Sequence, residues 1–120
     1  MTLSVTVHVR DAESGKLLDR PIDRPGATLA GFESWREAVY GSTALKSRGA
    51  HFLPHLAHDN LYIEGPDLPN FIRECETLLR DVDALAADTG QDAETLRFRL
   101  SNLREAAERA SAIGGVIWIS

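Results

Sequence analysis

Apolar and polar side chains alternate along residues 2–10, the period of two that is typical of a strand with one buried and one solvated face. Turn residues follow at 11–16. Residues 17–23 favour a returning edge strand, in which Pro21 is tolerated because an edge residue need not donate a hydrogen bond to a neighbouring strand. The pattern therefore predicts a strand or a hairpin at the N-terminus.

Helical spacing begins near residue 30. Apolar residues three and four positions apart predict a first, shorter helix over residues 30–40. Residues 41–60 show no clear period and are expected to form a long irregular connector. Residues 60–65 favour a short strand that points alternate apolar side chains inward and ends at Gly65.

The clearest pattern covers residues 67–88, where apolar positions step by three and four and Asp67 is the expected N-cap. Asp92 is the expected cap of a second long helix, which ends at Gly114 and Gly115. Because the loop between these helices is short, the two should pack as an antiparallel hairpin.

The last segment, residues 116–120, is apolar on both faces, which is typical of a strand in the middle of a sheet. The connector at 41–60 or a second subunit is therefore expected to cover its back. Together the elements predict a single α+β domain over residues 1–120. Its small, mostly antiparallel sheet would contain the N-terminal strand or hairpin, the short middle strand and the central C-terminal strand, packed on the helical hairpin and the shorter helix.

The distribution of charged side chains indicates which class of partner the protein could bind. The 120 residues include 13 basic and 18 acidic side chains, a net charge of −5 that disfavours general nucleic-acid binding. Residues 59–94 carry ten acidic and two basic side chains, so that most of the negative charge lies there. Such a segment would speed the encounter with a basic partner.

The chain gives no sign of a membrane or an export route. Its longest apolar run, residues 114–119, is far shorter than the roughly 20 residues of a membrane span, and the N-terminus lacks the regions of an export signal. The single cysteine, Cys75, can form no internal disulfide and falls in an apolar stripe, where a thiol is buried and inert. We therefore expect a soluble, cytoplasmic protein.

The segment "HFLPHLAHD" (51–59) holds three of the four histidines. Its first two histidines have the spacing of metal ligands on a helix, but Pro54 lies between them and disfavours a helix that runs through it. His55, His58 and Asp59 then share one short turn, too few ligands for a structural metal site. We expect no metal or cofactor, and an exposed, pH-sensitive contact surface. The residues expected to anchor the connector to the core are Phe52, Leu53 and Leu56.

Acidic side chains form two rows on the polar face of the expected helix 67–88. An ordinary solvated face with weak ion pairs explains each residue alone, whereas a docking surface for a basic partner explains the excess of negative charge. The candidate partner-binding residues are Glu74, Asp81, Asp88, Glu76, Asp83, His55, His58 and Asp59.

Catalytic motifs are missing from the sequence, which contains no GxSxG, P-loop, GxGxxG, HExxH or paired CxxC. Carboxylates on an exposed helix face also lack the pocket that acid–base catalysis needs. We therefore expect no enzymatic activity. Phe98, which lies off the apolar stripe, should either pack under the connector or form an exposed anchor for a partner.

Five segments together resemble a family of small bacterial immunity-type proteins that are associated with polymorphic toxin and contact-dependent inhibition systems. They are "GFESWREAVYG" (31–41), "HFLPHL" (51–56), "NLYIEGPDLPNFIRECETLL" (60–79), "LRFRLSNLREAAERA" (96–110) and "GGVIW" (114–118). The resemblance implies a non-enzymatic protein that binds one cognate toxin and blocks its active site or substrate channel. A small histidine- or metal-dependent enzyme using His55, His58 and Asp59, or a structural homodimer, are the alternatives.

Overall fold

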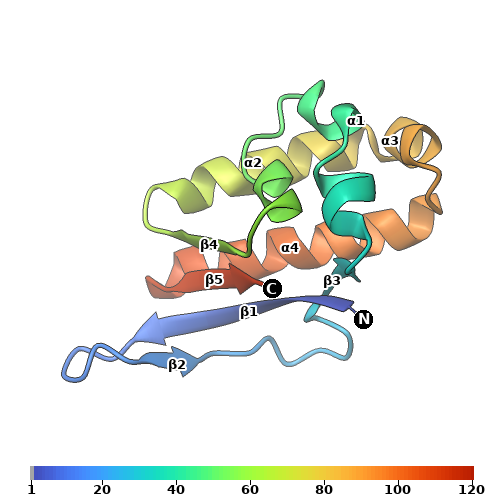
Figure 1. Ribbon diagram of the computed structural model, residues 1–120. Coiled ribbons are helices and arrows are strands. Elements are labelled where there is room, and N and C mark those ends of the chain that lie inside the picture. Colours follow the sequence, from blue (N-terminus) through green and yellow to red (C-terminus); the bar gives the residue numbers. More distant parts are fainter. Residues whose placement is uncertain (1) are drawn as a thin grey trace.

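A five-stranded antiparallel sheet packs against a layer of helices in the computed structural model, which describes residues 2–120 (Figure 1). The α+β class predicted from the sequence is confirmed. The strands are β1 (Thr2–Arg10), β2 (Leu17–Asp19), β3 (Leu29–Phe32), β4 (Leu61–Glu64) and β5 (Val116–Ile119). The helical elements are the π-helical turn η1 (Arg36–Tyr40), α1 (Thr43–Lys46), the 3-10 turn η2 (Leu53–Ala57), α2 (Asp67–Arg80), α3 (Val82–Thr89) and α4 (Ala93–Ile113).

The sheet has the order β2-β1-β5-β4, with β3 paired to the other end of β1. The C-terminal strand β5 therefore lies between β1 and β4, as its apolar sequence predicts. In register, Thr6 of β1 pairs with Trp118 of β5, and Trp118 pairs in turn with Tyr62 of β4. These three side chains consequently form one row across the sheet.

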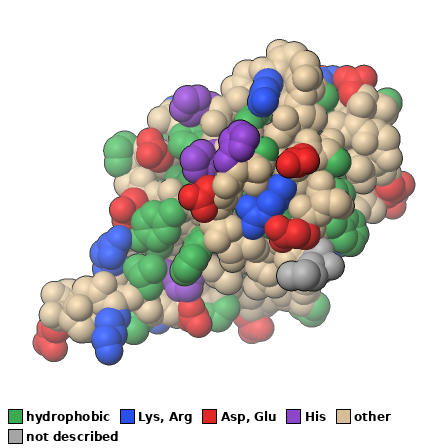
Figure 2. Space-filling view, viewed as in Figure 1, with side chains coloured by type: hydrophobic (Ala, Val, Ile, Leu, Met, Phe, Trp, Pro, Cys, Tyr) green, Lys and Arg blue, Asp and Glu red, His purple; other side chains and the backbone are tan. Residues whose placement is uncertain are grey.

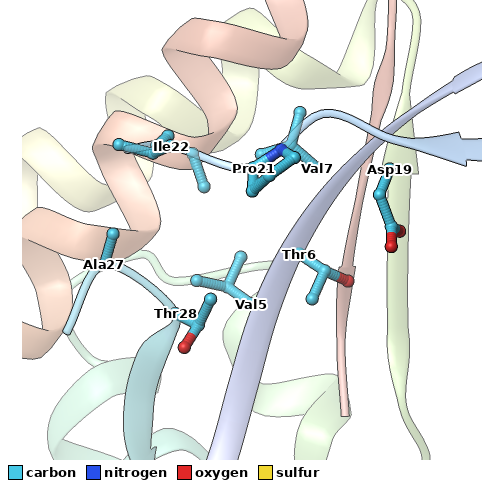
Figure 3. A pocket seen from close by; sticks show the side chains of 9 residues that line it. Val5, Thr6, Val7, Asp19, Pro21, Ile22, Ala27 and Thr28 are labelled. Atoms are coloured by element: carbon cyan, nitrogen blue, oxygen red, sulfur yellow. The ribbon is translucent and has the colours of Figure 1, made fainter. Parts of the chain in front are cut away.

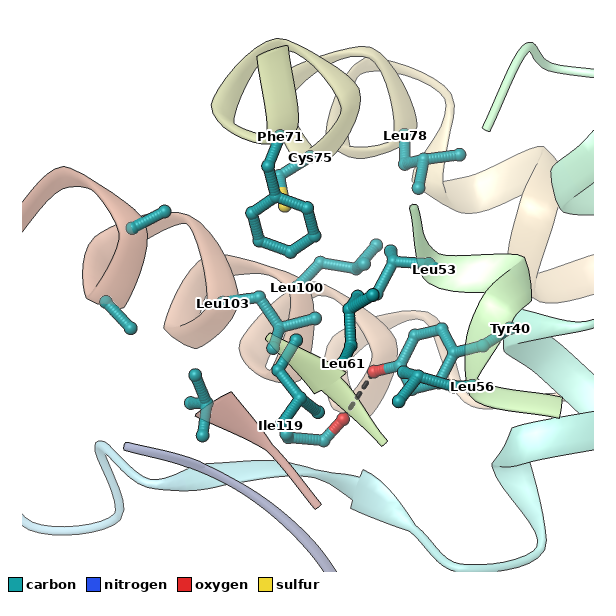
Figure 4. Packing of buried hydrophobic residues seen from close by; sticks show 14 of the residues in the cluster. Tyr40, Leu53, Leu56, Leu61, Phe71, Cys75, Leu78, Leu100, Leu103 and Ile119 are labelled. Atoms are coloured by element: carbon teal, nitrogen blue, oxygen red, sulfur yellow. Dashed lines mark hydrogen bonds between the residues drawn. The ribbon is translucent and has the colours of Figure 1, made fainter. Parts of the chain in front are cut away.

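The core lies between the sheet and the helices. Figure 4 shows side chains of α2, α4, β4 and β5 pointing toward one another, among them Phe71, Leu100 and Ile119, all fully buried. Cys75 lies in the same cluster, and burial raises the pKa of its thiol well above the ordinary value. The thiol is therefore held in its unreactive protonated form.

Cys75 should consequently resist thiol reagents in the folded protein. We expect a reagent such as Ellman's to modify it at least about 100-fold more slowly than in urea-unfolded protein, because reaction requires an opening of the core. The absorbance of the released thiolate measures both rates. Equal rates would show that Cys75 is accessible without unfolding.

The expected helix over residues 30–40 is wrong in its first half. Leu29–Phe32 forms β3 instead, because the start of β1 offers an edge that pairs with it from Thr2 to Ser4. Gly31 has φ +133°, which other residues rarely adopt, and a Cβ there would lie 2.7 Å from the Trp35 ring. Only Arg36–Tyr40 is helical.

The expected helix over residues 67–88 is interrupted at Asp81, whose φ of −113° and ψ of 23° end α2 before α3 begins. Asp67 is not a cap, since Pro66 holds the N-cap position of α2 and no side chain caps it. The Asp92 cap of α4 is confirmed, because its carboxylate accepts a hydrogen bond from the Thr95 backbone N–H at 2.9 Å. As predicted, α2 and α4 run antiparallel (Figure 1).

The connector at 41–60 is more ordered than its sequence indicates, because it contains α1 and η2. The edge strand expected over 17–23 is shorter, since β2 spans only Leu17–Asp19. Among the helices of residues 2–120, none combines the length and apolar composition of a membrane span.

Candidate binding surface

The face of the sheet that points away from the helices carries large exposed aromatic side chains. Trp118 is 42% exposed and Tyr62 is 40% exposed, although both belong to strands whose other face is buried. Figure 2 shows hydrophobic side chains gathered over β4 and β5. The expectation that the connector covers the back of β5 is therefore wrong, because residues 2–120 leave Trp118 open to solvent. We call Trp118, Tyr62 and Thr6 the aromatic row.

Arg10 borders the aromatic row. Its guanidinium reaches from β1 to β4, where Nη2 donates a hydrogen bond to the Tyr62 hydroxyl at 2.7 Å. The same group lies 5.9 Å from the centroid of the Tyr62 ring and 3.8 Å from a Glu64 carboxylate oxygen. The ion pair is half-exposed and adds little stability, but the contacts hold the Tyr62 ring in place. Tryptophan, tyrosine and arginine are the residue types most enriched among those that dominate binding energies.

His8 lies next to the aromatic row on β1. Its Nε2 is 2.9 Å from the Thr6 hydroxyl, and its Nδ1 is 2.9 Å from an Asp19 carboxylate oxygen. The His8 side chain is mostly buried, whereas the Asp19 side chain is 82% exposed. Asp19 therefore presents a negative charge to solvent at this side of the sheet.

Glu74 does not lie on the surface where the row of acidic residues was expected. It is only 9% exposed, and its carboxylate accepts hydrogen bonds from three consecutive backbone N–H groups of the connector. The bonds from Phe52 and Leu53 are both 2.9 Å long, and His51 gives the third. Glu74 of α2 thus caps the start of η2, where N–H groups lack partners within the turn.

Two other acidic residues of the expected rows share one cation. Arg48 lies 2.5 Å from Asp81 and 2.8 Å from Asp88, and these hydrogen bonds, Asp81 first, raise the pKa of Arg48. Asp83 is largely exposed and lies 3.2 Å from Arg97. Within residues 2–120, Glu76 has no ion-pair partner, although Arg80 lies four residues further along the helix. The acidic helix face is therefore partly neutralised.

The histidine connector has the geometry that Pro54 predicts. η2 includes Pro54 in its first turn, and its buried Leu53 and Leu56 anchor it to the core. His55 and His58 are exposed, and Asp59 accepts a hydrogen bond from the Asn60 backbone N–H at 2.7 Å. No three His, Cys, Asp or Glu side chains between residues 2 and 120 are placed to hold a metal ion. In Figure 2 a group of histidines lies beside the hydrophobic patch of the strands.

Phe98 does not pack under the connector. It is 40% exposed on α4, its ring lies 3.3 Å from the position of a Cβ at Gly26, and the Arg99 guanidinium lies 5.7 Å from its centroid. It therefore covers part of the segment between β2 and β3.

No protein-family model matches the chain, and neither curated proteins nor solved structures give a match. The resemblance to immunity-type proteins thus rests on the five segments quoted above. Most of their residues are apolar or turn residues that build the core. The exposed residues Trp118 and Tyr62 belong to two of these segments.

Proposed function

We propose that this protein is a non-enzymatic binding protein that holds a partner protein against the open face of its sheet. The exposed pair Trp118 and Tyr62 is the observation that carries the proposal. Aromatic side chains of this size bury about 150–250 Å² each when covered, and they lose little conformational entropy because the sheet already fixes their positions. Arg10 further restrains Tyr62.

The partner that we propose is a basic bacterial toxin domain, which the protein neutralises in the cytoplasm by covering its active site or substrate channel. The resemblance to immunity-type proteins supports this class of partner. The net charge of −5 supports a basic one, because opposite charge speeds encounter and disfavours acidic competitors. The turn η2 of the connector contacts β4, and its exposed histidines His55 and His58 are expected to contribute at the edge of the open face.

Replacing Trp118 with alanine tests the proposal. Co-expression with the toxin encoded by the neighbouring gene should protect the cell with the wild-type protein and fail with Trp118→Ala. We expect binding to weaken about 30-fold or more, as for a residue at the centre of an interface. Calorimetry or surface plasmon resonance with a catalytically inactive toxin measures this change.

Phe98→Ala provides the matched control, because Phe98, 40% exposed, nearly matches Trp118, 42% exposed, but lies on α4, in the other layer of the fold. The affinity of the Phe98→Ala variant for the toxin should stay within about twofold of the wild-type affinity. Failure of the wild-type protein to co-purify with the toxin, or equal affinities of Trp118→Ala and Phe98→Ala, would contradict the proposal.

A further inference from the structure

A cavity of about 240 Å³ opens where β2 and β3 diverge from β1 (Figure 3). β2 pairs with residues 8–10 of β1 and β3 with residues 2–4, so the stretch between them has no neighbouring strand on this side. Two single hydrogen bonds mark its ends. Val5 N–H donates to the Thr28 carbonyl at 2.9 Å, and Arg20 N–H donates to the Val7 carbonyl at 2.8 Å.

The walls of this cavity are apolar. Val5 and Val7 line it from β1, Ile22 and Ala27 line it from the segment between β2 and β3, and Ala106 of α4 closes it. An engineered apolar cavity of about 150 Å³ stays dry and binds benzene, so the present one has room for a branched aliphatic group. A water molecule would find few hydrogen-bond partners on these walls, so an apolar occupant is favoured.

The outer wall of the cavity is fixed in place by α4. Asn102 is 1% exposed, and its amide donates to the carbonyls of Gly26 at 3.0 Å and Leu29 at 2.8 Å. Its amide oxygen accepts from Arg24 at 2.8 Å. At the other end of the segment, Arg109 donates to the Arg20 carbonyl at 2.8 Å. The cavity is therefore preformed, and an occupant need not order the segment.

One carboxylate lies at the cavity. Asp19 belongs to its lining and keeps 82% of its side chain exposed, with one carboxylate oxygen 2.9 Å from the Nδ1 of His8. Thr6 also lines the cavity, and it is the residue that pairs with Trp118 in the aromatic row. Because Asp19 is opposite His8 in the register of β1 and β2, its carboxylate lies on the open face of the sheet, at the rim of the apolar cavity.

We infer that this cavity receives a branched aliphatic side chain of the protein partner, carried next to a basic residue that pairs with Asp19. Apolar walls select the aliphatic group, and the exposed carboxylate of Asp19 selects a cation beside it over an anion. The inference rests on the proposed function, and it deepens that function by naming the feature of the partner that the protein recognises.

Capped dipeptides test the inference without the partner. N-acetyl-Leu-Lys-amide, N-acetyl-Leu-Glu-amide and N-acetyl-Ala-Lys-amide would each be titrated into the nitrogen-15-labelled full chain and followed by amide chemical shifts. We expect the Leu-Lys peptide to shift the amides of Val5, Val7 and Ala27 saturably, at roughly millimolar concentration. The Leu-Glu peptide should bind about threefold more weakly, and the Ala-Lys peptide at least about tenfold more weakly.

Substitutions at Asp19 and Ala27, with Glu13→Gln as a control, show where the peptides bind. Asp19→Asn should remove the preference for lysine over glutamate, whereas Glu13→Gln, an equal change of charge in the β1–β2 turn, should retain it. Ala27→Leu fills the cavity and should abolish the shifts. If Ala27→Leu does not fold, the smaller Ala27→Val should still weaken binding at least about threefold.

Several results would overturn the inference: no saturable shifts with the Leu-Lys peptide, equal affinities for all three peptides, or unchanged binding by folded Ala27 variants. If no peptide binds while Trp118→Ala still weakens toxin binding, the cavity is not the anchor site and the proposed function stands. If the peptides bind as expected while Trp118→Ala binds the toxin normally, the proposed function is wrong.

Discussion

Replacing Glu74 with alanine is expected to lower the free energy of unfolding by about 4 kcal/mol, because three buried or partly buried backbone N–H groups lose their acceptor at once. Each unpaired group costs about 1–3 kcal/mol, and a domain of this size is stabilised by only about 5–15 kcal/mol in total. All three donors lie at or before the first residue of η2, where a backbone N–H has no acceptor within the turn.

Urea unfolding measures this change, and hydrogen exchange at Phe52 and Leu53 should show the local opening. Glu76→Ala is the matched control, because Glu76 lies on the same helix and should cost less than about 0.5 kcal/mol. If the two variants have the same stability to within about 1 kcal/mol, then Glu74 does not hold the connector.

Replacing Gly115 with alanine is expected to cost about 3 kcal/mol. A Cβ at this position would lie 2.3 Å from the carbonyl oxygen of His8 and 3.3 Å from a Val9 methyl group. The first neighbour is backbone, so β1 and the start of β5 must move apart. Since Trp118 lies three residues further along β5, we also expect its fluorescence to change.

Gly90→Ala is the control that distinguishes the steric clash expected at Gly115 from the cost of backbone strain alone. Gly90 ends α3 with φ +69° and has no atom within 4 Å of the position of a Cβ, so its replacement should cost only about 1 kcal/mol. Thermal or urea unfolding of both variants gives the comparison. If the two variants were equally destabilised, β1 and the start of β5 would be able to move apart without a cost in free energy, and the predicted clash with His8 would be wrong.

Local signals in the sequence predict the elements that depend on local interactions. The alternation of β1, the Asp92 cap and the Gly114 stop of α4 belong to this group, and all three are confirmed. β3 depends instead on a distant edge, because residues 29–32 become a strand only when the start of β1 lies beside them. The 3.6-residue period of their neighbours favoured a helix, and tertiary pairing overrode it.

The candidate site was harder to predict than the fold, because its residues acquire their roles across long separations in sequence. Glu74 looks like one member of an acidic row, yet it meets N–H groups 21–23 residues away. Pro54 is typical of the first turn of a helix, where N–H groups need an acceptor from outside, and it is the signal that could have pointed to Glu74. Trp118 lies in a strand that is apolar on both faces beside a half-polar one, and this pattern predicts a cover by the connector or a second subunit, of which the connector leaves Trp118 exposed.

The pairing of the first strand with the last determines when this fold can form. Ser4 and Ser120 exchange two backbone hydrogen bonds, of 2.8 and 3.0 Å, so the central pair of the sheet joins positions more than 100 residues apart. During synthesis β1 must wait for β5 to leave the ribosome, and until then the edge of β1 that pairs with β5 stays open. Contacts of such long sequence separation form slowly, so we expect the chain to fold more slowly than its small size suggests.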